Sequence, residues 1–507
     1  MRQLTLIRTT CLLKKTFIIF FVCLMFTGCT FSGNSNTQIS PIITVATEPT
    51  FPPFEFQSST GKLEGFDIDL MRAIGNAGGF EVKFQSLPFD GIIPALQTST
   101  VDAAISAISI TKERLNTISF SRPYFKAGLA IAVRNNNNKI INLDSLKNQE
   151  IAVQIGTTGA ETAKTISGAK IRTFDSAPLA LQELINGNVK AVINDAPVTL
   201  YAIKTGNLKG IKVGTQLLTE EYYGIATGKN SRNLTRINEG LKKVLETGTY
   251  SQIYQKWFNS LPPDLPISLP FSESPAKKST FFSVFISSLP LLFQGALITL
   301  QLTGLSVFFG IIGGCLIGIG RLSSYRPLSF LARVYIDFFR GTPLLVQIFM
   351  IYFGLPALIQ EFGVTFNLER LPAAVLALSL NSSAYIAEIM RAGIQSIERG
   401  QTEAAISLGL GPVQTLRFVI LPQAFRRMLP ALGNEFITLL KDTSLVAVIG
   451  FEELFRRGQL IVAENYRSFE IYSMVALVYL ALTLLSSQAF TRLEIWMNPV
   501  KQKKMDD

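Results

Sequence analysis

The sequence has 507 residues, of which 48% are hydrophobic and 16% charged, and its formal net charge is +11. This length exceeds that of one ordinary domain, and the apolar content is high for a purely soluble protein. The basic residues form no single stripe and many flank apolar runs, which argues against nucleic-acid binding and points to a membrane-embedded protein. The chain contains no histidine and no CxxC pair, so we expect neither histidine-based catalysis nor a metal site.

The first 28 residues predict a secretory signal peptide. Basic residues precede an apolar core from Thr16 to Phe26, which is too short to span a bilayer comfortably. The run that ends at Cys29 resembles a lipoprotein cleavage box, except that Phe26 stands where leucine is usual. Lipidation of Cys29 and an uncleaved anchor or nearby cleavage remain alternatives. In either case residues 29–41 form a tether, and the segment that follows leaves the cytoplasm.

Residues 42–260 alternate short apolar strands with amphipathic stretches. Such alternation predicts parallel sheets that carry ligand sites at the carboxyl ends of their strands. The pattern restarts near Ile151, which predicts two lobes, with crossings at Ala130–Arg134 and Tyr222–Thr227. The expected strands are Ile42–Thr47, Val82–Gln85, Ala103–Ser106, Ile151–Gln154 and Ala191–Asn194, and the expected helices are Ile68–Ala77, Ile92–Gln97, Ala160–Ile166 and Ala177–Ile185.

Several motifs follow one another in this region. They are Thr47-Glu48-Pro49-Thr50-Phe51-Pro52-Pro53-Phe54, Gly65-Phe66-Asp67-Ile68-Asp69, Ser109-Ile110-Thr111-Lys112-Glu113-Arg114, Phe120-Ser121-Arg122-Pro123-Tyr124, Gly156-Thr157-Thr158-Gly159 and Asn194-Asp195-Ala196-Pro197. In this order they resemble the family 3 type polar amino-acid-binding proteins of bacterial importers. The resemblance implies the type II periplasmic-binding-protein fold, α/β and two-lobed.

A free amino acid is a zwitterion, so its site needs a guanidinium for the carboxylate and a carboxylate for the ammonium. The resemblance implies that Arg114 holds the α-carboxylate, helped by Ser109 and Thr158. It also implies that Asp195 holds the α-ammonium. Because Arg114 and Asp195 belong to different lobes, a bound zwitterion would favour closure of the two lobes.

The choice of ligand side chain is less restricted. Glu48 matches a position that often carries an acid facing the ligand side chain, and Phe51 and Phe89 match aromatic positions that enclose its aliphatic stem. An acid there suits arginine, lysine, ornithine or glutamine and would repel glutamate or aspartate. Gln154 is a further candidate contact that favours amides, so basic amino acids and glutamine both remain open.

A proline-rich linker, 261–280, leads to an all-α transmembrane domain, 281–495, and a cytoplasmic tail, 496–507. One span needs ~20 apolar residues. Phe281–Phe293 is expected along the outer surface, and arginines gather on the predicted cytoplasmic side. The five expected spans are Gly295–Gly320, Gly341–Gln360, Leu371–Ala387, Leu429–Phe451 and Ile471–Thr491.

A cytoplasmic segment between the third and fourth expected spans carries a further motif. Glu403-Ala404-Ala405, then Gly409 and Leu421-Pro422, resemble the EAA loop of importer permeases, with Val419 where isoleucine is usual. Arg340-Gly341-Thr342-Pro343-Leu344 and Lys441-Asp442-Thr443-Ser444-Leu445 resemble the polar amino-acid branch (histidine/glutamine/arginine type). The resemblance implies that this loop inserts into a groove of the ATP-hydrolysing subunit.

The sequence thus predicts the membrane subunit of an ATP-binding-cassette importer in a bacterial inner membrane, fused to its own extracytoplasmic binding domain. No GxxxxGK[ST] phosphate loop is present, so ATP and Mg²⁺ are expected on a separate ATPase subunit rather than as cofactors of this chain. Two copies of the chain are expected to form the pathway. The alternatives are a ligand-gated channel or a sensor with an exported amino-acid-binding domain, and an enzyme is not expected.

Overall fold

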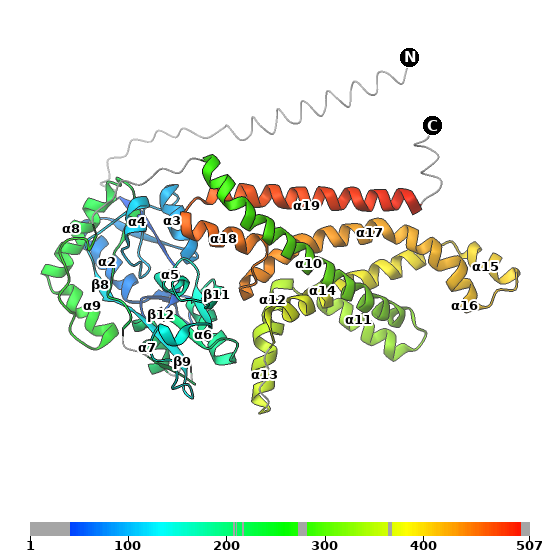
Figure 1. Ribbon diagram of the computed structural model, residues 1–507, viewed down its shortest axis with the longest axis horizontal. Coiled ribbons are helices and arrows are strands. Elements are labelled where there is room, and N and C mark those ends of the chain that lie inside the picture. The colour runs from blue at the N-terminus through cyan, green and yellow to red at the C-terminus, as the bar shows by residue number, and fades with distance from the viewer. Residues whose placement is uncertain are drawn as a thin grey trace, which may run out of the picture. The chain divides into compact units, whose positions relative to one another are not determined.

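The computed structural model describes residues 41–205, 208, 210–214, 217–271, 281–363 and 368–497 (Figure 1). The predicted signal peptide, Cys29, nearly all of the tether, part of the linker and nearly all of the tail lie outside the described residues. The described chain consists of an α/β region of two lobes followed by a region built only of helices.

The first lobe is built on a five-stranded sheet in the order β5-β1-β6-β15-β7. β1 pairs in parallel with β5 and β6, whereas β15 runs antiparallel to β6 and β7. The strands are β1 (Ile42–Thr47), β5 (Glu81–Ser86), β6 (Ala103–Ala104), β7 (Ile118–Phe120) and β15 (Ala226–Gly228). The helices of this lobe are α2 (Phe66–Gly78), α3 (Phe89–Gln97), α4 (Lys112–Thr117), α8 (Asn233–Glu246) and α9 (Thr249–Phe258), and a small sheet holds β2 (Thr50–Phe51), β3 (Glu55–Gln57) and β4 (Leu63–Glu64).

The second lobe has a sheet of the order β11-β10-β12-β9-β13. Its interior strand β10 (Glu150–Gln154) shows why the sheet forms, because Ile151 and Val153 enter one hydrophobic cluster and Ala152 enters another. A strand with apolar residues on both faces belongs inside a sheet that helices cover on both sides. The other elements are β9 (Leu129–Arg134), β11 (Lys170–Phe174), β12 (Ala191–Asp195), β13 (Ile211–Val213), the 3₁₀ turn Asp144–Leu146, and the helices α5 (Thr158–Lys164), α6 (Ala177–Asn186) and α7 (Ala196–Lys204).

Two short strands connect the lobes, β8 (Phe125–Ala127) and β14 (Glu221–Tyr223), and they pair antiparallel. The predicted crossing at Ala130–Arg134 is wrong, because these residues belong to β9 inside the second sheet. The run is apolar and buried except for Arg134, and it therefore fits an interior strand better than an exposed connection. The second predicted crossing, Tyr222–Thr227, overlaps β14 and then enters β15 of the first lobe.

The region after the linker is helical throughout its described residues. Its longest element, α10 (Phe281–Leu322), runs without interruption through Pro290, so the expected separation of a surface segment from a first span is not seen. The other elements are α11 (Arg326–Gly341), α12 (Leu344–Phe349), the π-helical turn Met350–Gly354, α13 (Leu355–Glu361), α14 (Arg370–Gln395), α15 (Arg399–Ser407), α16 (Pro412–Gln414), the π-helical turn Thr415–Ile420, α17 (Leu421–Asp442), the 3₁₀ segment Thr443–Ile449, α18 (Leu454–Asn465) and α19 (Ser468–Met497).

In the part of the chain that the structure describes, three helices are long and apolar enough to cross a membrane. They are Phe282–Leu322, Arg370–Gln395 and Ser468–Met497. Two further helices, Arg326–Gly341 and Leu344–Ile359, meet at 107° and make a fourth crossing only if they are taken as one broken span. The count of five is therefore not confirmed. The helix at the fourth expected span, α17, contains Glu435, Lys441 and Asp442 and is not apolar enough by composition.

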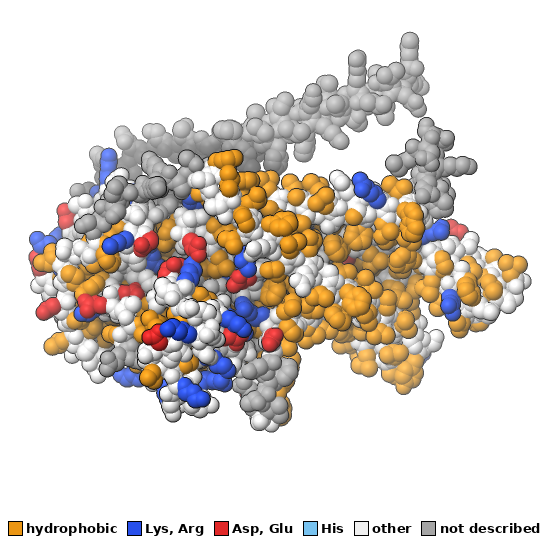
Figure 2. Space-filling view, in the orientation of Figure 1, with side chains coloured by type: hydrophobic (Ala, Val, Ile, Leu, Met, Phe, Trp, Pro, Cys, Tyr) orange, Lys and Arg blue, Asp and Glu red, His pale blue; other side chains and the backbone are white. Residues whose placement is uncertain are grey.

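Close packing of α10 against α14 depends on small residues. A Cβ atom added at Gly314 would lie 2.6 Å from Cγ2 of Ile386, and one added at Gly313 would lie 3.1 Å from Cβ of Ser383. Small residues let the backbones of two helices approach where lipid gives little hydrophobic driving force. Large apolar side chains such as Phe308, Leu316 and Leu480 are instead exposed, and Figure 2 shows hydrophobic side chains gathered over the helical region.

Candidate functional site

The cleft between the two lobes collects most of the predicted binding residues. It lies at strand ends, since Gln154 closes β10 and Asp195 closes β12, and ligand sites of such sheets lie beyond the carboxyl ends of the strands. Ser109 and Arg114 come from the first lobe, and Thr158 begins α5 of the second. The cleft is lined by Phe51, Phe89, Ser106, Ala107, Ser109, Arg114, Gln154, Thr157, Thr158 and Asp195.

Arg114 is 3% exposed and lies on α4, where the side chain of Thr111 caps the helix by accepting from the amide of Arg114 at 3.2 Å. Its guanidinium donates to the carbonyl of Ser109 at 2.8 Å and to the carbonyl of Gly156 at 2.8 Å. The guanidinium also lies 5.5 Å from the ring centre of Phe89. A cation held by the first lobe thus reaches across to the second lobe and lies over an aromatic ring.

Asp195 is 6% exposed, and its Oδ1 accepts a hydrogen bond from the hydroxyl of Tyr223 at 2.7 Å. Burial raises the pKa of Asp195 to about 7, and the nearby charge of Glu221 raises it as well, whereas Tyr223 and Arg114 lower it. When a carboxyl is buried away from solvent, a cation beside it stabilises its ionised form. The site of Asp195 therefore suits a bound ammonium group.

Glu48 is buried but lies one hydrogen bond behind the cleft lining. Its carboxylate accepts from Thr50 Oγ1 at 2.8 Å and from Gln154 Nε2 at 2.7 Å. Burial raises the pKa of Glu48 to about 7. The amide oxygen of Gln154 is buried without a hydrogen-bond donor, and buried acceptors are normally satisfied. The Glu48–Gln154 pair can thus receive N–H donors from a ligand side chain.

The two predicted aromatic residues, Phe51 and Phe89, both line the cleft. Phe51 is 5% exposed and packs into the core of the first lobe, with its ring centre 6.3 Å from that of Phe54. Phe89 begins α3 and stacks on Arg114. The structure thus gives both rings packing partners inside the protein as well as a place at the cleft.

Glu221 begins the crossing strand β14 and is not among the residues predicted from the sequence. Its Oε2 accepts from Ser109 Oγ at 2.6 Å and from Thr158 Oγ1 at 2.9 Å, so one carboxylate joins a hydroxyl of each lobe. Three further lining residues were not predicted: Ser106 ends a predicted strand, Ala107 follows it, and Thr157 belongs to a quoted motif, and these positions are the signal that could have found them. Glu221 carries no such signal beyond its place beside an expected crossing.

The residual space of this cleft is small, about 10 Å³, which is roughly what one water needs. Hydrogen bonds from Arg114 to Gly156 and from Gln154 to Glu48 cross between the lobes. An amino acid can therefore enter only when the lobes separate, which breaks these two bonds.

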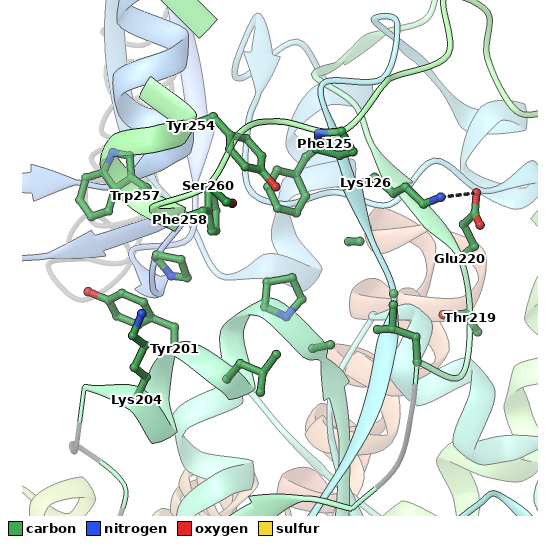
Figure 3. Close-up of a pocket in the computed structure, with 18 of the residues that line it drawn as sticks. Phe125, Lys126, Tyr201, Lys204, Thr219, Glu220, Tyr254, Trp257, Phe258 and Ser260 are labelled. Atoms are coloured by element: carbon green, nitrogen blue, oxygen red, sulfur yellow. Dashed lines mark ion pairs between the residues drawn. The ribbon is translucent and has the colours of Figure 1, made fainter. Parts of the chain in front are cut away.

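A much larger cavity, of about 1110 Å³, lies elsewhere between the lobes and shares no lining residue with this cleft (Figure 3). Aromatic side chains of α9 line it from the first lobe and residues of α7 line it from the second. Its charged pair, Lys126 and Glu220, is already joined at 3.1 Å. The opposite charges that a zwitterion needs are available instead in the smaller cleft, at Arg114 and Asp195.

The predicted coupling residues lie in a helix–turn–helix of the helical region, formed by α15 and α16 (Figure 1). Glu403 and Ala404 are exposed on α15, whereas Ala405 is 3% exposed. Gly409 follows the helix with φ of +83°, which L side chains rarely adopt, and the amide of Leu410 reaches back to the carbonyl of Ala405 at 3.1 Å. The turn exposes the apolar side chains of Ile406 and Leu408, at 56% and 83%.

Comparison with known proteins matches each region to a family. Residues 43–260 match the bacterial extracellular solute-binding proteins, family 3, and residues 307–498 match the binding-protein-dependent transport system inner membrane component. The glutamine transport system permease protein GlnP of Escherichia coli (strain K12) is 44% identical over 213 residues, which cover 42% of this chain and 95% of that relative. The chain belongs to this inner-membrane transport family.

A second permease agrees with this membership. The arginine transport system permease protein ArtQ of Bacillus subtilis (strain 168) is 40% identical over 204 residues, covering 40% of this chain and 91% of the relative. Among solved structures, an ancestral arginine-binding protein bound to arginine is 43% identical, covers 44% of this chain and all of its own, and gives a TM-score of 0.42.

These findings confirm the predicted function. The protein is a membrane subunit of an ATP-binding-cassette amino-acid importer that carries a fused substrate-binding domain, and its relatives are transport permeases rather than enzymes. It is a multi-pass inner-membrane protein. The comparisons give no support to a ligand-gated channel or a sensor.

Proposed function

We propose that the cleft binds a basic amino acid or glutamine through both ends of its zwitterion. Arg114 holds the α-carboxylate with Ser109 and Thr158, and Asp195 holds the α-ammonium. The observation that carries this proposal is that a buried guanidinium of one lobe and a buried carboxyl of the other line the same small cleft. A zwitterion there compensates both charges and replaces the cross-lobe bond of Arg114.

The ligand side chain points to the Glu48–Gln154 pair, with Phe51 and Phe89 against its stem. An unpaired amide oxygen and a neighbouring carboxyl accept N–H groups, which guanidinium, ammonium and amide ends all provide. The glutamine and arginine systems named for the two relatives are in keeping with this range of ligands. A glutamate side chain would place a second anion beside Glu48 and is rejected.

The test is a calorimetric titration of the full chain in lipid nanodiscs with arginine, lysine, glutamine and glutamate. We expect saturable binding of at least one of the first three and none of glutamate. Binding of no amino acid would overturn the function of the cleft, and preferential binding of glutamate would overturn the side-chain assignment alone.

We further propose that the segment of Glu403, Ala404, Ala405 and Gly409 docks on a separate ATPase subunit that carries ATP and Mg²⁺, with Ala405 packed inside the segment. The exposed apolar residues beside this turn support the proposal, because they can enter a groove of a partner. Two copies of this chain form the pathway through five spans, the fourth of which is α17. The chain is oriented with 42–260 outside, 261–280 as linker, and the arginine-rich loops and residues 496–507 in the cytoplasm.

A further inference from the structure

Two acidic side chains lie buried behind the floor of the cleft, Glu55 at the start of β3 and Asp67 in the first turn of α2. Both are 0% exposed. Neither forms an ion pair with a lysine or arginine of the described residues. Two buried carboxyls without a cation call for another form of compensation, because an isolated buried charge is costly.

Each of these carboxyls holds one residue of the cleft floor. Oε1 of Glu55 accepts from Ser106 Oγ at 2.8 Å, and the same hydroxyl accepts from the amide of Glu48 at 3.0 Å. Oδ2 of Asp67 accepts from the amide of Ala107 at 2.8 Å and from the hydroxyl of Tyr124 at 2.7 Å. Ser106 and Ala107 both line the cleft.

The bond to Ala107 has a particular role, because this residue has φ of +45°. A left-handed conformation is uncommon for a residue with a Cβ and persists only where the surroundings hold it. The anion of Asp67 receives this amide and also lies in the first turn of α2, where the helix dipole favours negative charge. Asp67 therefore fixes the backbone that faces the ligand.

The remaining oxygens, Oε2 of Glu55 and Oδ1 of Asp67, are buried, and no described group donates a hydrogen bond to either. The two side chains lie within hydrogen-bonding reach of each other, but two ionised carboxylates can only accept. Two ionised carboxyls in contact repel each other, and one proton between them supplies the missing donor. We propose that Glu55 and Asp67 share one proton, carried by Glu55, and that this pair positions Ser106 and Ala107 for the amino acid.

The surroundings agree with this distribution of charge. Burial raises the pKa of both groups, that of Asp67 to about 6 and that of Glu55 well above its ordinary value. The other titratable groups that act on the pair are Glu48 and the hydroxyls of Tyr124, Tyr223 and Tyr250, and none of them supplies a positive charge. Folding raises the pKa of both carboxyls, so their contribution to the free energy of unfolding is fully present below the pKa values of the unfolded chain. This contribution falls as the pH rises through the pKa values of the folded protein.

The first arm of the test needs no ligand. Infrared difference spectra of the full chain in nanodiscs are recorded at pH 8, where Glu48 and Asp195 are mostly ionised. We expect a protonated-carboxyl band that Glu55→Gln removes and that the control Glu48→Gln retains. A spectrum in which Glu55→Gln removes no such band overturns the shared proton.

The second arm rests on the proposed function and measures binding of whichever amino acid the intact protein takes up. The amide of Glu55→Gln can donate to Asp67 as the shared proton does, so its Kd should stay within about threefold of the parent, whereas Glu55→Met should bind at least tenfold more weakly. Equal Kd values for the two variants, or a tenfold loss of affinity in Glu55→Gln, overturn the positioning role.

If Glu55→Met does not fold, Glu55→Gln alone decides between the outcomes. Its Kd should stay near that of the parent, and its thermal stability between pH 5 and pH 9 should vary less with pH than the parent's. An intact protein that binds no amino acid would refute the proposed function. The shared proton would then be tested by the infrared spectra alone.

Discussion

The two regions of the chain use buried and exposed surface in opposite ways. The lobes place their apolar residues in closed cores and bring buried polar groups, such as Arg114 and Asp195, to the cleft between them. The helical region leaves large apolar side chains exposed, and its helices approach through small residues such as Gly314. We therefore expect compensated charge to govern ligand binding in the lobes, and the fit of small residues to govern the packing of α10 on α14.

The largest effect is expected in the cleft. Arg114→Ala leaves the ligand carboxylate without its partner in a buried site, so the affinity should fall about a hundredfold, or about 3 kcal/mol. Titration calorimetry of the full chain measures this loss. The matched control is Glu113→Ala, an exposed neighbour on α4 whose replacement should leave the affinity unchanged. Retained affinity in Arg114→Ala would show that charge compensation does not govern the lobes.

The second effect concerns the coupling turn. Gly409→Val forces a branched side chain into φ of +83°, whereas Gly411, two residues on, has φ of −68° and tolerates alanine. With the ATPase subunit present, we expect uptake of labelled amino acid to fall about tenfold in Gly409→Val and to stay near the parent level in Gly411→Ala. The Kd of the cleft should be the same in both variants. Normal uptake in Gly409→Val would remove the turn from the coupling path.

Packing of the helices provides the third test. Gly314→Ala places a methyl 2.6 Å from Ile386, while the same change at Gly304, on the same helix, meets nothing within 4 Å. Overpacking typically destabilises by about 1–3 kcal/mol. The melting temperature of the detergent-solubilised chain should therefore fall in Gly314→Ala and not in Gly304→Ala. Equal melting temperatures would mean that α10 and α14 can move apart without a loss of thermal stability.

The smallest effect is a pH dependence of ligand preference. Burial raises the pKa of Glu48 to about 7, so a closed cleft with an uncharged ligand side chain favours protonated Glu48 and loses affinity above this pH. A cationic side chain favours the ionised form instead. The ratio of the Kd for glutamine to the Kd for arginine should therefore rise about tenfold between pH 6 and pH 8. Glu48→Gln should abolish this change, and a constant ratio in the parent would place the ligand side chain away from Glu48.

Most of the predicted residues line one cleft in the structure, because several of them lie at the end of a strand or the start of a helix, as Gln154 and Thr158 do. Arg114 and Asp195 line the same cleft although they belong to different lobes with separate sheets, and the alternation of strands and helices does not encode how two lobes face each other. The crossing at β8 could not be predicted, since three residues of a connecting strand carry no periodicity and the stronger apolar run of β9 lies beside them.

Long-range hydrogen bonds could not be predicted from the sequence either. Glu221 joins Ser109 and Thr158 from positions 112 and 63 residues away, and no spacing rule encodes such contacts. In the helical region, composition located the apolar helices but not their ends. α10 continues through Pro290 without a break. Because α17 carries charged side chains, composition does not fix the number of membrane crossings.

The turn at Gly409 has a consequence for the proposed assembly with an ATPase subunit. A left-handed glycine closed by the bond from Leu410 to Ala405 gives the loop one backbone shape before any partner arrives. Ordering a flexible loop would consume part of the free energy of association, so a preformed turn lets more of the contact surface contribute to affinity. A bulky residue at this position would then weaken association even where every contacting side chain is kept.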